Sequence, residues 1–148
     1  MSKILTITDM DENGSGYKTI CTPLFNGLAK LGHDIKCVGL MYRGQEHTND
    51  FSIIPCASVQ DAQAVANNII HLWNPDVIIV ALDLPLQEMF FNYLGHFKVP
   101  YIAITPLENG PLTMSWAAPL FNMSAVFFIS ELGKLEAQKS GVHKAEHS

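Results

Sequence analysis

The sequence predicts an α/β fold with a doubly wound, mainly parallel sheet and helices on both faces. Strand patterns and amphipathic helix patterns alternate along the chain, and several strands are continuous apolar runs, which is typical of strands buried on both faces. The connections between them are short, as in repeated β-α-β units. A chain of 148 residues without internal repeats has the length of a single domain with one core.

The expected strands and helices follow in chain order. The strands are Lys3–Thr8, Asp34–Leu40, Asp76–Leu82, Pro100–Thr105 and Ala125–Ile129, with a weaker pattern at Phe51–Cys56. The helices are Lys18–Leu31, Val59–Trp73, Leu86–Phe97, Ser115–Phe121 and Glu131–Lys139. Ser58 with Asp61 resembles a capping box at the second helix. Because Pro23 inside a helix would cost about 3 kcal/mol or more, we expect either Thr22 to cap a helix that begins at Pro23 or a short turn to precede a kink.

Composition excludes several classes of function. A net charge of −5 disfavours a nucleic-acid binder, which would normally present a basic face. Apolar stretches end well short of the ~20 residues that span a bilayer, and the N-terminus is a strand pattern instead of a signal peptide. Cys21, Cys37 and Cys56 have no metal-binding or CxxC spacing, so we expect free buried thiols and a cytoplasmic protein.

The Gly-rich segment Gly14-Ser15-Gly16-Tyr17, between the first strand and the first helix, is the leading candidate site. Backbone N–H groups at a helix N-terminus, with roughly half a positive charge from the peptide dipoles, favour a phosphorylated ligand. The segment lacks the third glycine of GxGxxG, because position 19 is Thr19, and it contains no GK[ST]. A turn that only connects two elements is an equally good interpretation.

Further candidates follow the other strands, whose carboxyl ends face ligands in open α/β sheets. Asp9, with the acidic residues that follow it, suits a hydroxyl-rich substrate or an exposed charged loop, and we expect no metal. Asp83 could bind a sugar hydroxyl, but a helix N-cap is the favoured interpretation. Glu108 and Asn109, in the loop 106–112, form either an acceptor-binding loop or a simple turn. We expect His33 to mark a helix end with a local hydrogen bond.

Four segments together resemble a known family. They are Gly14-Ser15-Gly16-Tyr17, Leu28-Ala29-Lys30-Leu31-Gly32-His33-Asp34-Ile35 (family pattern "LaxxGHeV"), Asn74-Pro75-Asp76-Val77-Ile78, and Ser130-Glu131-Leu132-Gly133 ahead of Ser140-Gly141-Val142. Their order and spacing resemble the N-terminal domain of a two-domain, Rossmann-type (GT-B fold) retaining glycosyltransferase of group 1, similar to family 4. Glu108-Asn109 departs from a "PxDGxPL" loop found in some relatives.

The resemblance implies that residues 1–148 form a single N-terminal, acceptor-side domain whose C-terminal nucleotide-sugar domain is absent. Gly14, Ser15, Gly16 and Tyr17 would then bind the donor diphosphate. The acceptor side would hold Asp9, Asp83, Glu108 and Asn109, with Glu108 as the candidate catalytic residue. A nucleotide-sugar is the expected co-substrate, without cofactor or metal. We expect the isolated chain to fold without transferring sugar, and an apolar face left exposed could drive its dimerisation.

Two other classes remain open at this point. A stand-alone Rossmann-like or flavodoxin-like module, with a nucleotide-binding or regulatory role, has the right length, although a phosphorelay receiver would need a Lys after the last strand. An NAD-linked enzyme is disfavoured by the incomplete glycine motif and by the absence of an acidic residue at the end of the second strand. Neither the donor nor the acceptor is specified by the sequence.

Overall fold

The computed structural model describes residues 2–11, 16–94, 97–105, 125–128 and 145–147. The chain divides into two compact units, Met1–Ala81 and Leu82–Ser148. The first unit contains β1 (Lys3–Asp9), α1 (Gly16–Lys30), β2 (Asp34–Leu40), β3 (Ser52–Cys56), α2 (Val59–Trp73) and β4 (Val77–Ala81). The expectation of one domain over residues 1–148 stays a prediction.

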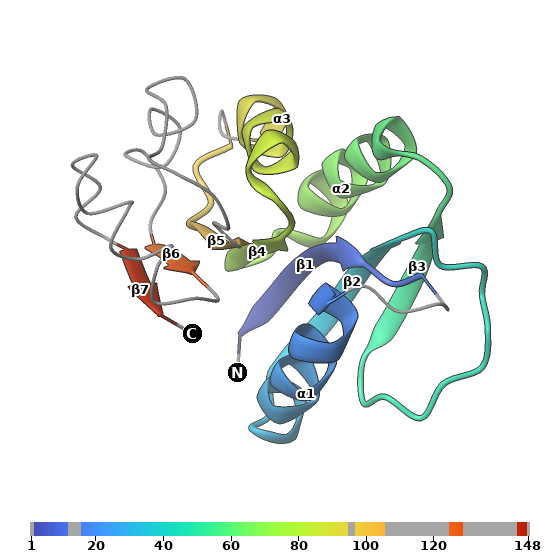
Figure 1. Ribbon diagram of the computed structural model, residues 1–148. Coiled ribbons are helices and arrows are strands. Elements are labelled where there is room, and N and C mark those ends of the chain that lie inside the picture. The colour runs from blue at the N-terminus through green and yellow to red at the C-terminus, as the bar shows by residue number, and fades with distance from the viewer. Residues whose placement is uncertain (1, 12–15, 95–96, 106–124, 129–144, 148) are drawn as a thin grey trace. The chain divides into compact units, whose positions relative to one another are not determined.

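The strands of the first unit pair in the order β3-β2-β1-β4, and every pair is parallel. The chain moves outward from β1 to β2 and β3, and then returns to the far side of β1 as β4. Since such crossovers are right-handed, α1 and α2 must cover opposite faces of the sheet, as Figure 1 shows. The predicted doubly wound parallel sheet is confirmed, and the weaker strand pattern at Phe51–Cys56 is a real strand.

The core of this unit surrounds β1, which is buried on both faces. Leu5 and Ile7 of β1 are fully buried, and α2 contributes the buried residues Ala62, Ala66 and Ile70. The buried hydroxyl of Thr8 donates a hydrogen bond to the carbonyl of Ala81 at 2.9 Å, next to the backbone ladder between β1 and β4. Apolar side chains therefore fill the core, and this polar group inside it has a partner.

Local hydrogen bonds define the ends of both helices in this unit. Ser58 Oγ accepts a hydrogen bond from the Asp61 N–H at 3.1 Å, which confirms the predicted cap of α2. Gly32, with φ +99°, ends α1 in a Schellman arrangement, in which the N–H of His33 donates to Leu28. His33 thus marks the helix end with a local hydrogen bond, as predicted, and its side chain adds a distant one: Nδ1 accepts from the N–H of Ser2 at 3.2 Å.

Neither alternative predicted at Pro23, a helix that begins there after a Thr22 cap or a short turn before a kink, is correct, since α1 is helical from Gly16 to Lys30 with Pro23 inside it. Proline removes a single backbone donor, so only one carbonyl, four residues earlier, loses its helical partner. Pro23 and Leu24 are exposed, which places this turn toward solvent, where water can satisfy that carbonyl. The cost of the proline is therefore tolerated.

The second unit contains α3 (Leu84–Leu94), β5 (Tyr101–Thr105), β6 (Ala125–Phe128) and β7 (Ala145–His147). The last three strands are parallel neighbours in the order β5-β6-β7. Buried Gln87 joins α3 to this sheet: its Nε2 donates to the carbonyls of Leu82 and Ile104, and its Oε1 accepts from the Tyr101 hydroxyl at 2.9 Å. Burial raises the pKa of Tyr101 well above its usual value.

Two of the predicted helices, Ser115–Phe121 and Glu131–Lys139, lie outside the described residues. The short strand β7 was not predicted, because three residues are too few to show an alternating pattern. Of the helices that the structure describes, none is long and apolar enough to cross a bilayer.

All three cysteines are free and buried, as predicted. Burial raises the pKa of the Cys37 thiol to about 12 and that of Cys21 to about 11, although a hydrogen bond to Thr8 acts in the opposite direction on Cys21. The pKa of Cys56 is also raised by burial. These thiols remain protonated near neutral pH, so they are poor nucleophiles.

Gly39 is a position where any side chain would clash. A Cβ atom there would lie 2.7 Å from Cγ2 of Ile53 and 3.0 Å from Cβ of Tyr42. We expect Gly39→Ala to lower the free energy of unfolding by about 1–3 kcal/mol through overpacking, measured by urea denaturation. Gly27→Ala is the control: Gly27 lies in α1 with open space around it and should gain about 0.5–1 kcal/mol. Equal effects at both positions would contradict this account.

The raised thiol pKa values predict a loss of stability at high pH. The unfolded chain releases thiol protons above pH of about 9, whereas the folded chain retains them up to about 11 at Cys21 and about 12 at Cys37. The unfolded state therefore binds fewer protons in this window, and the free energy of unfolding falls as the pH rises through it. Urea denaturation of Cys37→Ala at about pH 8 and about pH 10 should show a smaller fall than the unsubstituted chain. An identical fall would rule out this cause.

Candidate functional site

The carboxyl ends of the strands in the first unit meet at one edge of the sheet. Asp9 at the end of β1 is in register with Leu40 at the end of β2, and the Met10 N–H donates to the Leu40 carbonyl at 2.9 Å. On the other side of β1, Thr8 pairs with Ala81 of β4. Residues that follow β1 and β2 therefore share this edge, where open α/β sheets bind ligands.

Asp9 shapes the start of the predicted Gly-rich loop. Its half-buried carboxylate accepts a hydrogen bond from the Asp11 N–H at 3.0 Å, which closes a turn directly after β1. Gly16 and Tyr17 are the first residues of α1, two residues earlier than the helix was predicted to begin. Gly14 and Ser15 lie outside the described residues. The diphosphate-binding role of this segment stays a prediction.

The remaining predicted site residues, Asp83, Glu108 and Asn109, belong to the second unit. Asp83 precedes α3 in the second unit, and its backbone carbonyl accepts from the Gln87 N–H at 2.9 Å. This is the N-cap position, as favoured from the sequence, and the Asp83 side chain is exposed. Glu108 and Asn109 lie outside the described residues, so their acceptor-binding and catalytic roles stay predictions.

A cavity of about 200 Å³ lies at the shared edge of β1 and β2. The connection between β2 and β3, residues 41–51, forms one wall of it without any helix or strand of its own. The residues that line the cavity are Met10, Tyr42, Gln45, Glu46, His47, Asn49 and Ile53. The sequence of this loop contains no motif that identifies an acceptor. The available signals were its place after β2 and its length without secondary structure, which is common in functional loops.

Hydrogen bonds and backbone geometry hold the first half of this loop in shape. Met41 and Gly44 have left-handed φ values of 63° and 84°. The hydroxyl of buried Tyr42 donates to the Gln45 carbonyl, and Gln45 Oε1 accepts from the Arg43 N–H at 2.9 Å. The loop therefore folds back on itself around Tyr42, which closes one side of the cavity.

The second half of the loop is attached to α1. Asn26 of that helix donates through Nδ2 to Asn49 Oδ1 at 3.0 Å and accepts through Oδ1 from the Asp50 N–H at 2.7 Å. Phe51 packs edge-on against the buried ring of Phe25, with 5.7 Å between ring centroids. A single asparagine and an aromatic pair thus fix the end of the loop to the helix.

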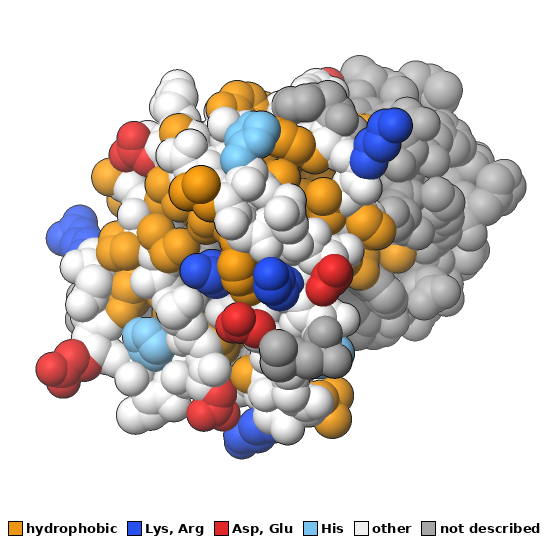
Figure 2. Space-filling view, turned by 180° about the vertical axis from the view of Figure 1, so that it is seen from behind, with side chains coloured by type: hydrophobic (Ala, Val, Ile, Leu, Met, Phe, Trp, Pro, Cys, Tyr) orange, Lys and Arg blue, Asp and Glu red, His pale blue; other side chains and the backbone are white. Residues whose placement is uncertain are grey.

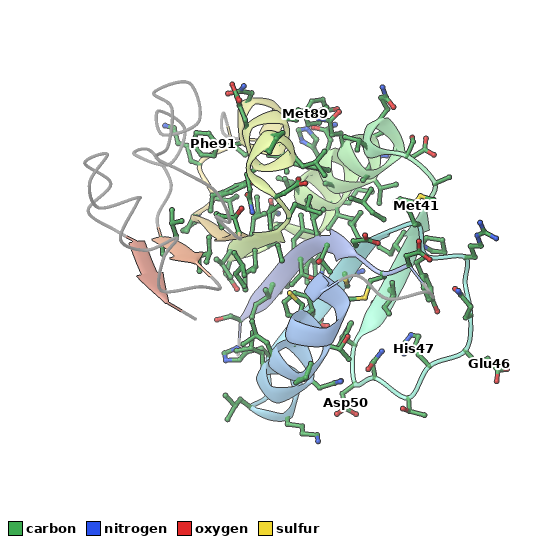
Figure 3. The ribbon with its side chains drawn as sticks, viewed as in Figure 1. Met41, Glu46, His47, Asp50, Met89 and Phe91 are labelled. Atoms are coloured by element: carbon green, nitrogen blue, oxygen red, sulfur yellow. The ribbon has the colours of Figure 1, made fainter. Side chains whose placement is uncertain are left out.

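His47 lies within an aromatic group built by this loop. Its ring stacks near Phe51 at a centroid distance of 6.4 Å and meets the edge of Tyr42 at 6.2 Å. Its Nδ1 accepts from the Asn49 N–H at 3.2 Å. In Figure 3 the His47 side chain lies on the inner side of the loop, whereas Asp50 points outward. His47 is therefore positioned on the cavity side by contacts with three other loop residues.

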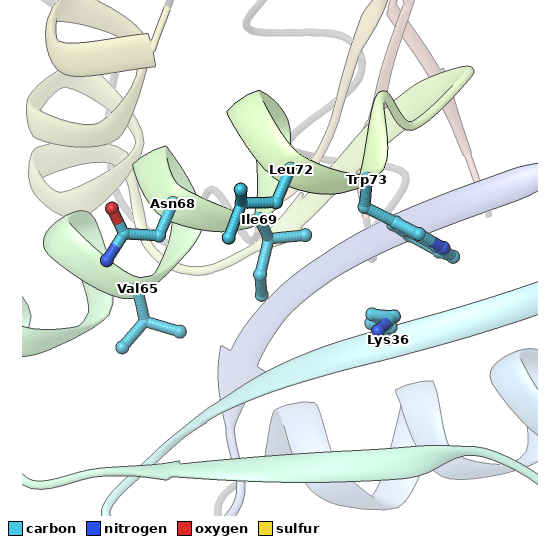
Figure 4. Close-up of a pocket in the computed structure, with 6 residues that line it drawn as sticks. All are labelled: Lys36, Val65, Asn68, Ile69, Leu72 and Trp73. Atoms are coloured by element: carbon cyan, nitrogen blue, oxygen red, sulfur yellow. The ribbon is translucent and has the colours of Figure 1, made fainter.

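A second cavity, of about 270 Å³, lies between α2 and β2 (Figure 4). Its lining residues are Lys36, Val65, Asn68, Ile69, Leu72 and Trp73. The Lys36 ammonium lies 5.1 Å from the centroid of the Trp73 ring, a cation–π distance. The lining of this second cavity is mostly apolar, with Lys36 and Asn68 as its polar side chains. It also lies away from the carboxyl edge of the sheet, so it is not the candidate catalytic site.

The surface seen from behind in Figure 2 presents charges of both signs among scattered hydrophobic side chains. On the described part of that face, Lys and Arg side chains do not form a basic patch. Within the described residues there is also no group of His, Cys, Asp and Glu side chains that could hold a metal ion.

Asn26 offers a direct test of how the loop is held. We expect Asn26→Ala to lower the free energy of unfolding by about 1–2 kcal/mol, because two hydrogen bonds are lost, and to speed hydrogen exchange at the Asp50 amide. Asn67→Ala, on α2 at the opposite face of the sheet, is the matched control and should leave that amide unchanged. Unaltered exchange at Asp50 in Asn26→Ala would show that the loop is held by other contacts.

No protein-family model matches this sequence, and no curated protein matches it. Solved structures share its fold at low sequence identity. An alpha-glucosyltransferase in complex with UDP and a 13-mer DNA matches with a TM-score of 0.64 and 12% identity, over 99% of this chain and 40% of that one. A putative UDP-N-acetylglucosamine 2-epimerase from Listeria monocytogenes matches with a TM-score of 0.64 and 13% identity, over 97% of this chain and 44% of that one.

UGT71G1 from Medicago truncatula, complexed with UDP-glucose, matches with a TM-score of 0.60 and 8% identity, over 99% of this chain and 50% of that one. The chain thus spans half or less of the length of these three structures. Likeness at this level of identity establishes the fold, and the predicted one is confirmed: the chain has the Rossmann-like fold of a GT-B half-domain.

Proposed function

We propose that the chain is the N-terminal, acceptor-side half of a glycosyltransferase that moves a sugar from a nucleotide-sugar donor to a hydroxyl acceptor. The observation that carries this proposal is the cavity at the carboxyl edge of β1 and β2, lined by both polar and apolar side chains, in a fold that matches structures solved with UDP and UDP-glucose. The three free, buried thiols support a reducing, cytoplasmic setting.

The donor diphosphate would bind at the turn that follows Asp9. The Asp9 carboxylate closes a turn directly after β1, and α1 begins at Gly16. Backbone N–H groups of Gly14 to Tyr17 would stabilise the negative charge that develops on the leaving nucleoside diphosphate, as donors in an oxyanion hole do. A C-terminal domain would hold most of the nucleotide-sugar, and neither a metal nor a further cofactor is part of the proposal.

On the acceptor side, Asp9, Asp83, Glu108 and Asn109 stay the proposed binding residues, with Glu108 as the catalytic candidate. The cavity beside β2 adds Tyr42 and His47 to that side. A hydroxyl acceptor needs groups that both donate and accept hydrogen bonds, and such groups line this cavity.

Epimerisation of a nucleotide-sugar is a second candidate. It is favoured by fold matches to two UDP-N-acetylglucosamine 2-epimerases, from Listeria monocytogenes and Methanocaldococcus jannaschii, with TM-scores of 0.64 and 0.59. Both reactions use a nucleotide-sugar, but only glycosyl transfer consumes a hydroxyl acceptor. A stand-alone nucleotide-binding module is the remaining alternative and would turn over neither substrate.

An activity assay separates these candidates. The whole protein encoded by the gene is incubated with UDP-glucose, UDP-N-acetylglucosamine or GDP-mannose, with and without a pool of hydroxyl acceptors, and the products are identified by mass spectrometry. We expect release of a nucleoside diphosphate and a glycosylated product that both require the acceptor. An isomerised nucleotide-sugar formed without acceptor would instead establish epimerisation.

The same assay tests the half-domain part of the proposal. The 148-residue chain alone should release no nucleoside diphosphate, because in the proposed function a C-terminal domain supplies half of the donor site and the closure that excludes water. Sugar transfer by this chain alone would contradict the proposal, and so would turnover of NAD instead of a nucleotide-sugar by the whole protein.

A further inference from the structure

The cavity beside β2 has the size of a single small ring. Its volume of about 200 Å³ is below the roughly 300–1,000 Å³ of pockets that bury drug-sized ligands. A complete nucleotide-sugar, with its base, ribose, diphosphate and sugar, would not fit. The occupant is therefore one ring-sized unit, either a small molecule or one end of a larger one.

The charge of the lining excludes an anionic occupant. No Lys or Arg stands among the described residues that line the cavity, and Glu46 contributes a carboxyl group to it. Phosphates and carboxylates are usually held by Arg or Lys side chains or by a helix N-terminus. The lining thus favours a neutral molecule, unlike the loop after β1, where a diphosphate is proposed.

The chemistry of the lining suits a polyhydroxylated ring. Met10, Ile53 and the ring of Tyr42 provide apolar surface for the C–H faces of such a ring. The side chains of Gln45 and Asn49 are amides, which both donate and accept hydrogen bonds, as each hydroxyl group does. Apolar faces and polar edges are thus matched within one small space.

His47 adds a directed donor. Because its Nδ1 accepts from the Asn49 N–H, the neutral imidazole carries its proton on Nε2. Contacts with Tyr42 and Phe51 fix the plane of the ring. Little conformational entropy would be lost when a ligand binds, because the Asn26 contacts already hold the loop.

We infer that this cavity binds one neutral, monosaccharide-sized polyhydroxylated ring, and that His47 and Asn49 determine its specificity. The inference rests on the proposed function, in which this ring is the end of the acceptor that receives the sugar. It assigns the substrate class of the acceptor and locates its binding at the β2–β3 loop.

Binding is tested on the 148-residue chain itself by two-dimensional NMR. The probes are methyl α-D-glucopyranoside, methyl α-D-mannopyranoside and myo-inositol, with inorganic phosphate as the anionic comparison. At least one ring should shift the amide signals of Met10, Tyr42 and Asn49, while phosphate should leave them unchanged. His47→Ala and Asn49→Ala should each weaken binding by about tenfold. His71→Ala, exposed on α2, is the matched control and should bind as the unsubstituted chain does.

The inference would be overturned if phosphate alone shifted these amide signals, or if none of the three rings shifted them. So would unchanged binding in both His47→Ala and Asn49→Ala. Should His47→Ala fail to fold, His47→Gln replaces it: the amide retains a donor, so binding should weaken less than in Asn49→Ala, and equal or greater loss would count against His47.

Kinetics of the whole protein distinguish failure of this inference from failure of the proposed function. His47→Ala should raise the acceptor KM by about tenfold, whereas His71→Ala, the matched control, should leave both the acceptor KM and acceptor-independent donor hydrolysis unchanged. Sugar transfer that His47→Ala does not alter would remove the inference and keep the function. If the chain bound a ring but the whole protein transferred no sugar, the cavity would still be a ring-binding site and the proposed function would be removed.

Discussion

The pairing of β1 with a parallel strand on each side is the constraint from which the rest of the first unit follows. Because β2 and β4 both run parallel to β1, the chain must return over the sheet after β1 and again after β3. The two returns move in opposite directions, which places α1 and α2 on opposite faces. The same pairing brings the ends of the three strands to one edge, with the Thr8 hydroxyl bonded to Ala81 beneath it.

The candidate site exists because one of these connections is a loop. Parallel neighbours are usually joined by a helix, but residues 41–51 join β2 to β3 without one. Gly39 lets Tyr42 and Ile53 pack directly over β2, and Asn26 of α1 ties down the far end of the loop. The loop forms one wall of the small cavity at this edge of the sheet. Fold and site therefore have a common origin in this connection.

Local patterns predicted most of the elements, and failures occurred where the decisive contact was distant. Ser58 was correctly identified as a cap because its partner lies three residues away. Pro23 was judged by the cost of proline in an isolated helix, whereas its exposure in the folded chain reduces that cost. His33 makes the predicted local bond through its N–H to Leu28, while its side chain is bonded to Ser2, which only the fold brings beside it. Local rules thus miss the contacts and the exposure that depend on the folded chain.

The sequence by itself determined the α/β class, the parallel sheet and the resemblance to a GT-B half-domain, because buried strands and amphipathic helices carry periodic apolar patterns. Only the tertiary structure decided that the β2–β3 loop encloses a cavity, with His47 held between Tyr42 and Phe51. The physical reason is that the loop has no periodicity. Its shape comes from single contacts, such as Asn26 with Asn49, between residues that lie far apart along the chain.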